Sequence, residues 1–417
     1  MMRVSRARIL VGRFCVAVVW SAMCSLHGSA QDANPGKGIA FDLQQLSQIP
    51  KVFPAEVAPV AGVNAIFYEG LLYRGKQTKV FAYYGIPEPR GSENRETKVP
   101  GVVLIHGGGG TAFANWVKLW NDRGYAAIAM DVCGCVPVGT YGKWQRHPEG
   151  GPPGWDASFE QIDGPVEDQW QMHAVSDVAL ANSILRSFPR VDAERIGVTG
   201  ISWGGYMTCL VAGVDPRFRC AAPVYGCGFL GENSAWLPSF ERMGQEKSQK
   251  WLDQWDPSVY LPKAKMPFLW VNGTNDFAYP MDSWQRSAML HSPKTLSLRI
   301  RMPHGHGPAG ENPEEIHVFM NSILRGDKPF PKILELLGEG PIKSGRYQSE
   351  VRMVKAELCF TKDSGKWQDR LWESIPAVLN TDVSTFSAIL PADARVWYFN
   401  LFDNRDCVVS TKHFIVQ

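Results

Sequence analysis

The stretch Arg195–Tyr206 constrains the fold of this chain more than any other, because it reads as a buried strand, a sharp turn and the start of a helix. Ser202 lies at the apex of the turn, within the sequence G-I-S-W-G. The flanking glycines, Gly200 and Gly204, predict that the strand and the helix pack too closely for side chains there. Such a turn holds a serine hydroxyl over the end of a sheet, where the helix N-terminus favours developing negative charge. Since a G-x-S-x-G string also occurs by chance in Gly-rich chains, its context in the sequence decides its meaning.

Residues 1–30 predict a secretory signal. Four arginines precede an apolar run from Phe14 to Leu26, and the small residues Gly28 and Ala30 follow, which predicts cleavage before Gln31. The run is shorter than an ordinary membrane span, and an uncleaved anchor is the alternative. Without these arginines 39 basic and 41 acidic residues remain, so the formal charge changes from +2 to −2. This balance favours neither nucleic acid nor an anionic membrane as a partner.

Apolar runs and helical patterns alternate between residues 65 and 325. The runs Gly101–His106 and Tyr125–Asp131 suit strands buried on both faces, and a helical pattern lies between them. Strand, helix and strand in this order predict a right-handed parallel unit. Similar runs at 220–225, 267–272 and 295–301 extend the pattern. The sequence therefore predicts an α/β domain with a mostly parallel central sheet and helices on both faces.

The remaining segments differ in character. Residues 31–64 read as a Pro-rich lead-in and residues 326–346 as a Gly/Pro/Lys linker. Residues 347–417 alternate apolar and polar positions with period two, which predicts a small all-β sandwich. Cys359 and Cys407 lie in two of its predicted strands, and a disulfide between them is one expectation. Cys209, on the helix after the turn, is expected to be a buried free thiol, and no zinc-type ligand spacing occurs.

Two segments, Cys133–Gln169 and Gly226–Trp255, show no regular pattern. Excursions of this length inside a domain are commonly functional loops and sometimes disordered, and we expect the first to form a wall over the active site. Several tryptophans in these segments could stack on sugar rings or anchor the loops. They are Trp144, Trp155, Trp236, Trp251 and Trp255.

Groups suited to acyl transfer follow the predicted strands. This chemistry needs a nucleophile, a base, an acid that orients the base, and donors for the oxyanion. Ser202 follows one strand, Asp276 follows the strand at 267–272, and His304 and His306 follow the last strand. Because parallel strands end at one edge of a sheet, we expect these side chains to meet there, in the chain order Ser, Asp, His.

Residues 65–325 resemble an α/β hydrolase. The motifs G-I-S-W-G-G, G-T-N-D at Asp276 and P-H-G-H-G at His306 resemble the branch with prolyl-oligopeptidase-type peptidases, acetyl xylan esterases and dienelactone hydrolases. The resemblance implies the α/β-hydrolase fold, with Ser202 as nucleophile, Asp276 as orienting acid and His306 as base. The chain departs from dienelactone hydrolases, which use a cysteine nucleophile, and the C-terminal β domain fits none of these groups well.

Each assignment has an alternative. His304 is the alternative base, and Asp282 is the alternative acid, although its place at a helix start suits a cap. The oxyanion donors are expected to be the backbone N–H groups of Trp203 and of Gly108 and Gly109 in the Gly-rich turn after the first buried strand. A plain tight turn is the alternative there. It is not a phosphate loop, because no Gly-Lys-Ser/Thr follows.

The sequence thus predicts a secreted or periplasmic serine hydrolase without cofactor or metal. Its expected partner is a small-molecule or carbohydrate ester, with neither nucleic acid nor membrane as partner after signal cleavage. The alternatives are a prolyl-oligopeptidase-type peptidase and, in another class, a catalytically inactive binding protein on a hydrolase scaffold.

Overall fold

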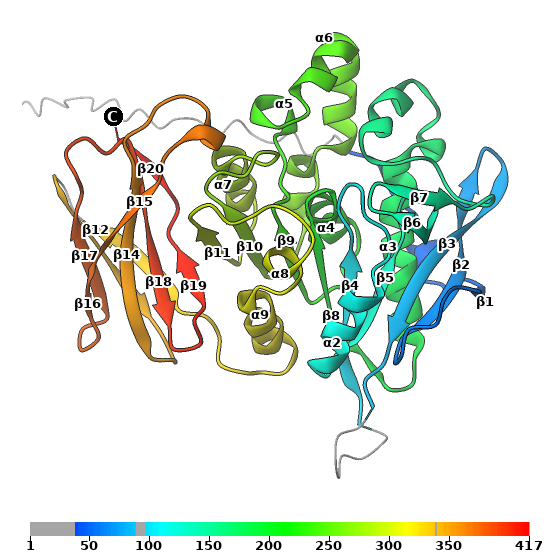
Figure 1. Ribbon diagram of the computed structural model, residues 1–417, viewed down its shortest axis with the longest axis horizontal. Helices are drawn as coiled ribbons and strands as arrows, with labels where there is room; N and C mark the ends of the chain where they lie inside the picture. Colours follow the sequence, from blue (N-terminus) through cyan, green and yellow to red (C-terminus); the bar gives the residue numbers. More distant parts are fainter. Residues whose placement is uncertain (1–37, 89–96, 338–339, 417) are drawn as a thin grey trace, which may run out of the picture. The chain divides into compact units, whose positions relative to one another are not determined.

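The structure, a computed structural model, describes residues 38–88, 97–337 and 340–416, so the predicted signal at 1–30 lies outside the described residues. Its central feature is a nine-stranded sheet in the order β1-β2-β3-β5-β4-β8-β9-β10-β11 (Figure 1). Strands β1, β2, β3 and β5 pair antiparallel in succession. Every pair from β5 to β11 is parallel. The predicted α/β class with a mostly parallel sheet is confirmed.

The strands of this sheet are β1 Val52–Pro54, β2 Asn64–Tyr73, β3 Lys76–Gly85, β4 Val99–Ile105, β5 Ala126–Met130, β8 Val191–Ile201, β9 Cys220–Val224, β10 Phe268–Gly273 and β11 Lys294–Arg299. The helices are α1 Leu43–Leu46, α2 Ala114–Asp122, α3 Trp170–Ser187, α4 Trp203–Val214, α5 Leu230–Asn233, α6 Leu237–Trp255, α7 Met281–Met289, α8 Pro308–Glu311 and α9 Glu314–Leu324.

Helices cover both faces of the sheet. Helices α3 and α4 pack together over β4, β5 and β8, whereas α2 and α9 lie on the opposite face, nearer the viewer in Figure 1. The Tyr125 hydroxyl before β5 donates a hydrogen bond of 2.6 Å to Asn321 of α9, which ties the ends of this second layer together. Strand β5 and all of β4 after Val99 are buried, as expected for continuous apolar runs covered on both sides. Among the described residues, no helix has the length and apolar content needed to cross a bilayer.

The C-terminal β part begins earlier than the sequence indicates. The predicted linker at 326–346 contains strand β12 (Lys332–Leu337) and most of β13 (Ile342–Gln348), which pair antiparallel. Ile333 and Leu336 pack against the apolar core of the β part, so the linker prediction is corrected. The Gly, Pro and Lys residues around this pair hid its apolar positions.

Two antiparallel sheets make up the β part, one with the order β12-β13-β17-β16 and the other β15-β14-β18-β19 with β20 on β18. Phe386 of the first sheet contacts Phe399 of the second with ring centroids 4.9 Å apart, as in a sandwich. The strand bounds are β14 Met353–Thr361, β15 Glu373–Pro376, β16 Val378–Asn380, β17 Thr385–Ile389, β18 Val396–Asp403, β19 Val408–Ser410 and β20 Phe414–Ile415.

The segment Gly226–Trp255, predicted to be irregular, is mostly helical. It contains α5 and α6, and α6 is interrupted at Gly244, whose φ of 75° breaks the helical pattern. Trp251 and Trp255 are fully buried four residues apart, and Trp236 is also buried. These three tryptophans therefore anchor the segment in the core and present no exposed ring for a sugar.

The possible disulfide between Cys359 and Cys407 does not form, and both thiols are free and buried. The strand register explains this result. Cys359 of β14 lies opposite Tyr398 of β18. The Asp403 N–H donates to the Cys407 carbonyl, and Asp403 lies opposite Met353, at the other end of β14. The two cysteines thus lie about six residues apart along β14, roughly 20 Å, far beyond disulfide reach. Cys209 is a buried free thiol, as expected.

Candidate active site

The turn between β8 and α4 places Ser202 in a strained conformation, with φ 58° and ψ −117°. A Cβ atom on Gly204 would lie 2.0 Å from the Ile105 carbonyl oxygen, and one on Gly200 would lie 2.2 Å from the Gly204 carbonyl oxygen. Only glycine fits at either position, because strand and helix approach so closely. The sequence prediction of a sharp strand–turn–helix is confirmed in its geometry.

Ser202 belongs to a continuous chain of three polar side chains. The Ser202 hydroxyl lies 2.9 Å from Nε2 of His304, and Nδ1 of His304 lies 2.6 Å from Oδ2 of Asp276. These residues follow β8, β11 and β10 in turn, at the carboxyl edge of the parallel sheet. The other oxygen of Asp276 accepts the backbone N–H groups of Ala278 and Tyr279 at 2.9 and 2.7 Å. The carboxylate is therefore held in place toward the imidazole.

The prediction that His306 stands beside Ser202 is wrong, because His304 occupies that position. His306 instead accepts the Gly107 N–H at Nε2 (2.9 Å) and faces Glu311 with Nδ1 (3.1 Å). Gly305 lies between the histidines with φ 151°, a conformation that favours glycine. The spacing of His304 and His306 in the sequence cannot show which of the two rings points toward Ser202.

Two aromatic rings that the sequence analysis missed enclose His304. Tyr225 stacks on the imidazole with centroids 4.6 Å apart and planes 27° apart, and Phe277 contacts it at 4.7 Å. Burial raises the pKa of Tyr225, and the nearby Asp276 adds to this shift. Tyr225 follows β9, so a strand-end position was its only signal in the sequence.

Asp282, the alternative acid, lies in the first turn of α7 and accepts a hydrogen bond from the Asn233 side chain of α5. Asp282 thus contacts the α5 segment, whereas the carboxylate that contacts His304 is that of Asp276. The structure thus brings Asp276, and not Asp282, to the histidine.

The Gly-rich turn after β4 packs against the serine turn. A Cβ atom on Gly107 would lie 3.1 Å from Cβ of Ser202, and one on Gly108 would lie 2.9 Å from the Trp203 ring. Trp203 is the first residue of α4, so its backbone N–H has no acceptor within the helix. Gly109, with φ 75°, instead lies against the ring of Tyr141. Of the two glycines predicted as oxyanion donors beside Trp203, the packing therefore favours Gly108 over Gly109.

The segment Cys133–Gln169 lies over this Gly-rich turn through the hairpin of β6 (Cys135–Thr140) and β7 (Lys143–Arg146). The Tyr141 hydroxyl donates to the Gly108 carbonyl at 2.7 Å, and the Trp144 indole donates to the Gly109 carbonyl at 2.8 Å. Trp144 therefore anchors the hairpin to the turn. After the hairpin come the short helices η1 (Trp155–Asp163) and η2 (Val166–Asp168).

A cavity of about 460 Å³ lies beside Asp276 and His304, and the β part supplies its opposite wall through residues 368–371. Asn275 fixes this wall, because its side-chain amide donates to the carbonyls of Gln368 and Arg370 at 2.9 and 2.7 Å. Nothing in the sequence indicates this contribution, since it depends on how the β part packs against the sheet.

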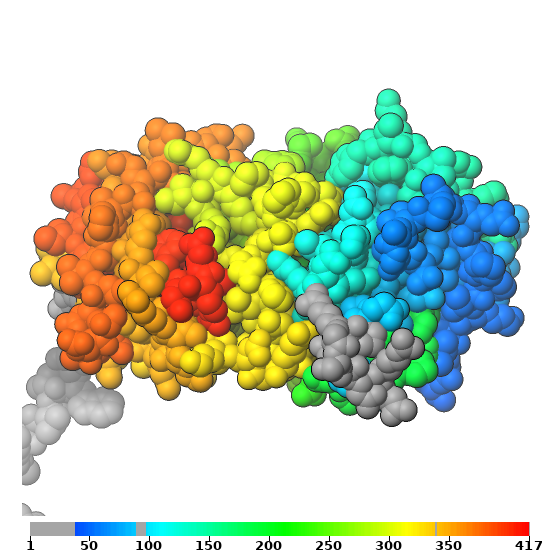
Figure 2. Space-filling view, turned by 60° about the horizontal axis from the view of Figure 1, so that its bottom comes forward, coloured from blue at the N-terminus to red at the C-terminus, as the bar shows by residue number. Residues whose placement is uncertain are grey.

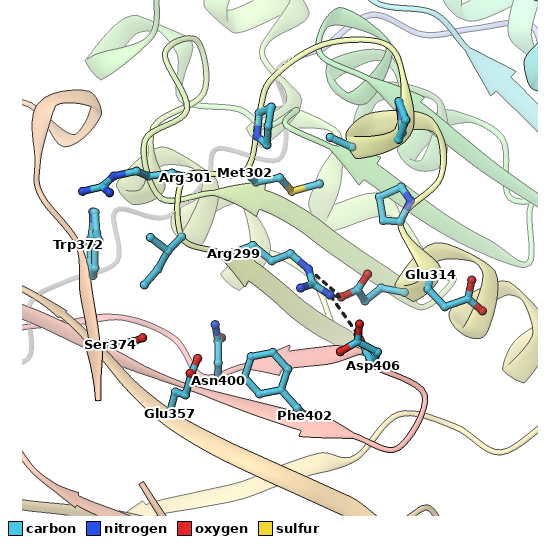
Figure 3. A pocket seen from close by; sticks show the side chains of 16 residues that line it. Arg299, Arg301, Met302, Glu314, Glu357, Trp372, Ser374, Asn400, Phe402 and Asp406 are labelled. Atoms are coloured by element: carbon cyan, nitrogen blue, oxygen red, sulfur yellow. Dashed lines mark hydrogen bonds and ion pairs between the residues drawn. The ribbon is translucent and has the colours of Figure 1, made fainter. Parts of the chain in front are cut away.

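A second cavity of about 710 Å³ shares the segment 301–303 with the first and lies between β11 and the β part. Figure 3 shows Trp372, Glu357 and Phe402 of the β part across this groove from Arg301 and Met302. Both cavities are lined by Arg301, Met302 and Pro303 on one side and by residues of the β part on the other.

Among the described residues, no group of three or more His, Cys, Asp or Glu side chains is arranged to hold a metal ion.

Two family models match parts of this chain. Residues 159–320 match the prolyl oligopeptidase family, and residues 56–235 match the acetyl xylan esterase (AXE1) family. The uncharacterized peptidase YuxL of Bacillus subtilis is 24% identical over 202 residues, covering 45% of this chain and 27% of YuxL. A putative carboxymethylenebutenolidase of Methylorubrum extorquens is 25% identical over 134 residues, covering 32% of this chain and 40% of that protein. The chain thus spans well under half the length of these relatives.

Solved structures show the same fold. An acetyl xylan esterase from a Paenibacillus species superposes with a TM-score of 0.54 at 22% identity, covering 68% of this chain and 92% of that chain. Acetyl xylan esterase 1 from a Thermoanaerobacterium species gives a TM-score of 0.51 at 18% identity, covering 69% and 95%. With the sheet order and the strained serine turn, these matches show that the chain has the α/β-hydrolase fold.

Proposed function

We propose that this chain is a serine hydrolase that cleaves carboxylic esters through an acyl-enzyme on Ser202. The observation that carries the proposal is the unbroken chain of hydrogen bonds from Ser202 through His304 to Asp276. In this arrangement a hydroxyl, a base and an orienting carboxylate meet at one point, as acyl transfer requires.

The geometry supports the following sequence of steps. Ser202 Oγ attacks the ester carbonyl carbon while His304 Nε2 takes the hydroxyl proton, and Asp276 stabilises the resulting imidazolium. The carbonyl oxygen becomes an oxyanion, which accepts hydrogen bonds from the backbone N–H groups of Trp203 and Gly108. Collapse of this intermediate breaks the bond to the alcohol, which leaves with the proton from Nε2. Water, deprotonated by the same nitrogen, then releases the acid and restores Ser202.

We propose an acetylated carbohydrate as the substrate. The match of residues 56–235 to acetyl xylan esterases supports a small acyl group. The cavity of about 460 Å³ beside His304 supports a bulky alcohol, because it offers open space next to the base. Export of the protein is a proposal supported by the charge and hydropathy pattern of residues 1–30.

The central test compares hydrolysis of p-nitrophenyl acetate by the wild type and by S202A and H304A. Each variant is expected to lose about 10³-fold or more in kcat, because the nucleophile or its base is gone. A fluorophosphonate probe is expected to label the wild type and not S202A. S364A, an exposed serine of the β part, is the control and keeps the wild-type rate. Equal rates in the wild type and S202A would refute the proposal.

The match of residues 159–320 to prolyl oligopeptidases supports a second candidate, a serine peptidase with the same three side chains. Faster release of arylamine from Pro- or Ala-arylamides than of alcohol from esters favours the peptidase. Failure of the probe to label folded wild-type protein favours the inactive binding protein instead.

A further inference from the structure

His306 lies between two partners that together fix the position of its proton. The Gly107 backbone N–H points at Nε2 from 2.9 Å. Because a backbone amide only donates, Nε2 is an unprotonated acceptor, and the neutral ring then carries its proton on Nδ1. Nδ1 faces Oε1 of Glu311 at 3.1 Å, where a carboxylate accepts that proton's hydrogen bond.

Helix α2 and the residue before it, Phe113, hold this His–Glu pair in place. Phe113 and Trp116 contact the His306 ring with centroid distances of 4.6 and 5.9 Å. The Trp116 indole also donates to the backbone carbonyl of Glu311 at 3.2 Å. The His306 side chain is only 11% exposed, so water competes little for either nitrogen. The ring is therefore held by hydrogen-bond partners at both nitrogens and by tilted and edge-on contacts with two aromatic rings.

The hydrogen bonds at Gly107 determine the orientation of the next peptide. Its N–H is bound by His306, and its carbonyl faces Nδ1 of His106 at 3.0 Å and the N–H of Gly110 at 3.0 Å. The Gly107 carbonyl and the Gly108 N–H belong to one planar peptide unit. The Gly107 N–H belongs to the preceding peptide unit, so His306 fixes that unit, while His106 and Gly110 fix the carbonyl of the next one. Gly107 is thus held on both sides, which sets the direction of the Gly108 N–H, and Gly108 packs against the Trp203 ring at the serine turn.

We propose that His306, oriented by Glu311, is a positioning residue that holds the His106–Gly107 peptide and, through Gly107, keeps the Gly108 N–H facing the oxyanion formed at Ser202. The proposal rests on the proposed function and adds a second histidine–carboxylate pair, which does not contact the reacting atoms. His304 moves the proton, and His306 keeps a donor in place.

The first test needs no enzymatic activity. In protein labelled with ¹⁵N-histidine, the signals of His306 are those that disappear in H306Q, and ¹⁵N shifts distinguish protonated from unprotonated ring nitrogens. We expect the proton on Nδ1 and a bare Nε2, because Nε2 accepts the Gly107 N–H. A proton on Nε2, in either the neutral or the charged ring, would overturn the contact with Gly107.

The second test separates positioning from packing through substituted residues. H306F keeps an aromatic ring against Phe113 but removes the acceptor for Gly107, whereas the side-chain oxygen of H306Q can still accept. We expect H306F to lower kcat by about 10- to 100-fold with little change in KM, because the affected donor acts in the transition state. H306Q is expected to recover most of this loss.

The matched control is His317, whose Nδ1 faces Glu314 at 3.2 Å in a similar pair on α9, away from the turn. H317F is expected to keep the wild-type kcat. The affinity for a trifluoromethyl ketone, which forms an oxyanion on Ser202, is expected to fall in H306F by the same factor as kcat/KM. Urea midpoints check that each variant is folded.

Two results would overturn the positioning role: a wild-type kcat in H306F, or a kcat in H306Q as low as in H306F. A wild-type protein without esterase activity and without probe labelling would instead refute the proposed function and the catalytic part of this inference. The nitrogen signals then decide the contact between His306 and Gly107 on their own.

Discussion

His173 and His413 are buried imidazoles whose protonation opposes folding. Burial lowers the pKa of His173 to about 4, and burial with the nearby Arg370 lowers that of His413 to about 4. In the unfolded chain both groups titrate near pH 6.5. Between these values the unfolded state binds more protons, so the free energy of unfolding falls as the pH falls.

We therefore expect acid destabilisation between about pH 6.5 and 4, with up to about 3 kcal/mol from each histidine. Urea unfolding at several pH values measures this slope. H413Q removes one titrating group and is expected to reduce the slope, and the double variant H173Q/H413Q to reduce it further. A slope unchanged in the double variant would show that carboxylates, and not these histidines, govern acid stability.

At the residue scale, Ser202 and Asp276 could be predicted as members of one polar cluster, because each directly follows a strand that the sequence makes recognisable. The histidine is different, since His304 and His306 lie two residues apart in one loop and both have carboxylate partners. Which ring reaches Ser202 depends on backbone angles at Gly305, and these angles have no signature in composition or spacing.

At the scale of elements, predictability follows burial. Strands such as β4 and β5 are covered on both faces and therefore leave continuous apolar runs in the sequence. Helix α6 exposes a polar face and is interrupted at Gly244, so its period is lost. Strand β12 has only two half-buried positions, Ile333 and Leu336, which lie three residues apart because the register shifts after Ile333. It therefore lacks the period-two alternation of a strand and reads as a linker.

The close approach of α4 to β4 predicts that glycine is required at position 204. In G204A the new methyl group would overlap the Ile105 carbonyl, 2.0 Å away, and backbone atoms cannot yield easily. We expect a loss of more than about 3 kcal/mol in unfolding free energy, or insoluble protein. G75A is the control, because Gly75 has φ 74° but nothing within 4 Å of its Cβ position. It is expected to cost only about 1 kcal/mol, and urea denaturation compares the two. A loss in G204A no larger than in G75A would show that strand and helix move apart to admit the methyl group, and that the close approach does not require glycine.

At the scale of the whole molecule, the β part completes the edge of the central sheet. Strand β11 is the last strand, and its Leu298 N–H donates to Ser410 Oγ at 2.8 Å, while the Asn400 side chain donates to the Leu298 carbonyl at 3.0 Å. Tyr398 and Val409 of the β part belong to the same apolar cluster as the sheet. The β part thereby covers β11, an edge strand that would otherwise be exposed. The same packing places residues 368–371 as a wall of the cavity beside His304.

Because the sheet and the β part share one core, we expect them to unfold together. S410A leaves the buried Leu298 N–H without its acceptor and is expected to cost about 1–3 kcal/mol. The loss should lower the urea midpoint equally by tryptophan fluorescence and by far-UV circular dichroism, since both parts contain strands and tryptophans. S374A, an exposed serine of β15, is the control with an unchanged midpoint. Two separate transitions in the wild type, or a shift confined to one of them in S410A, would mean that the β part folds as an independent unit and that the cavity wall at residues 368–371 is not fixed by the common core.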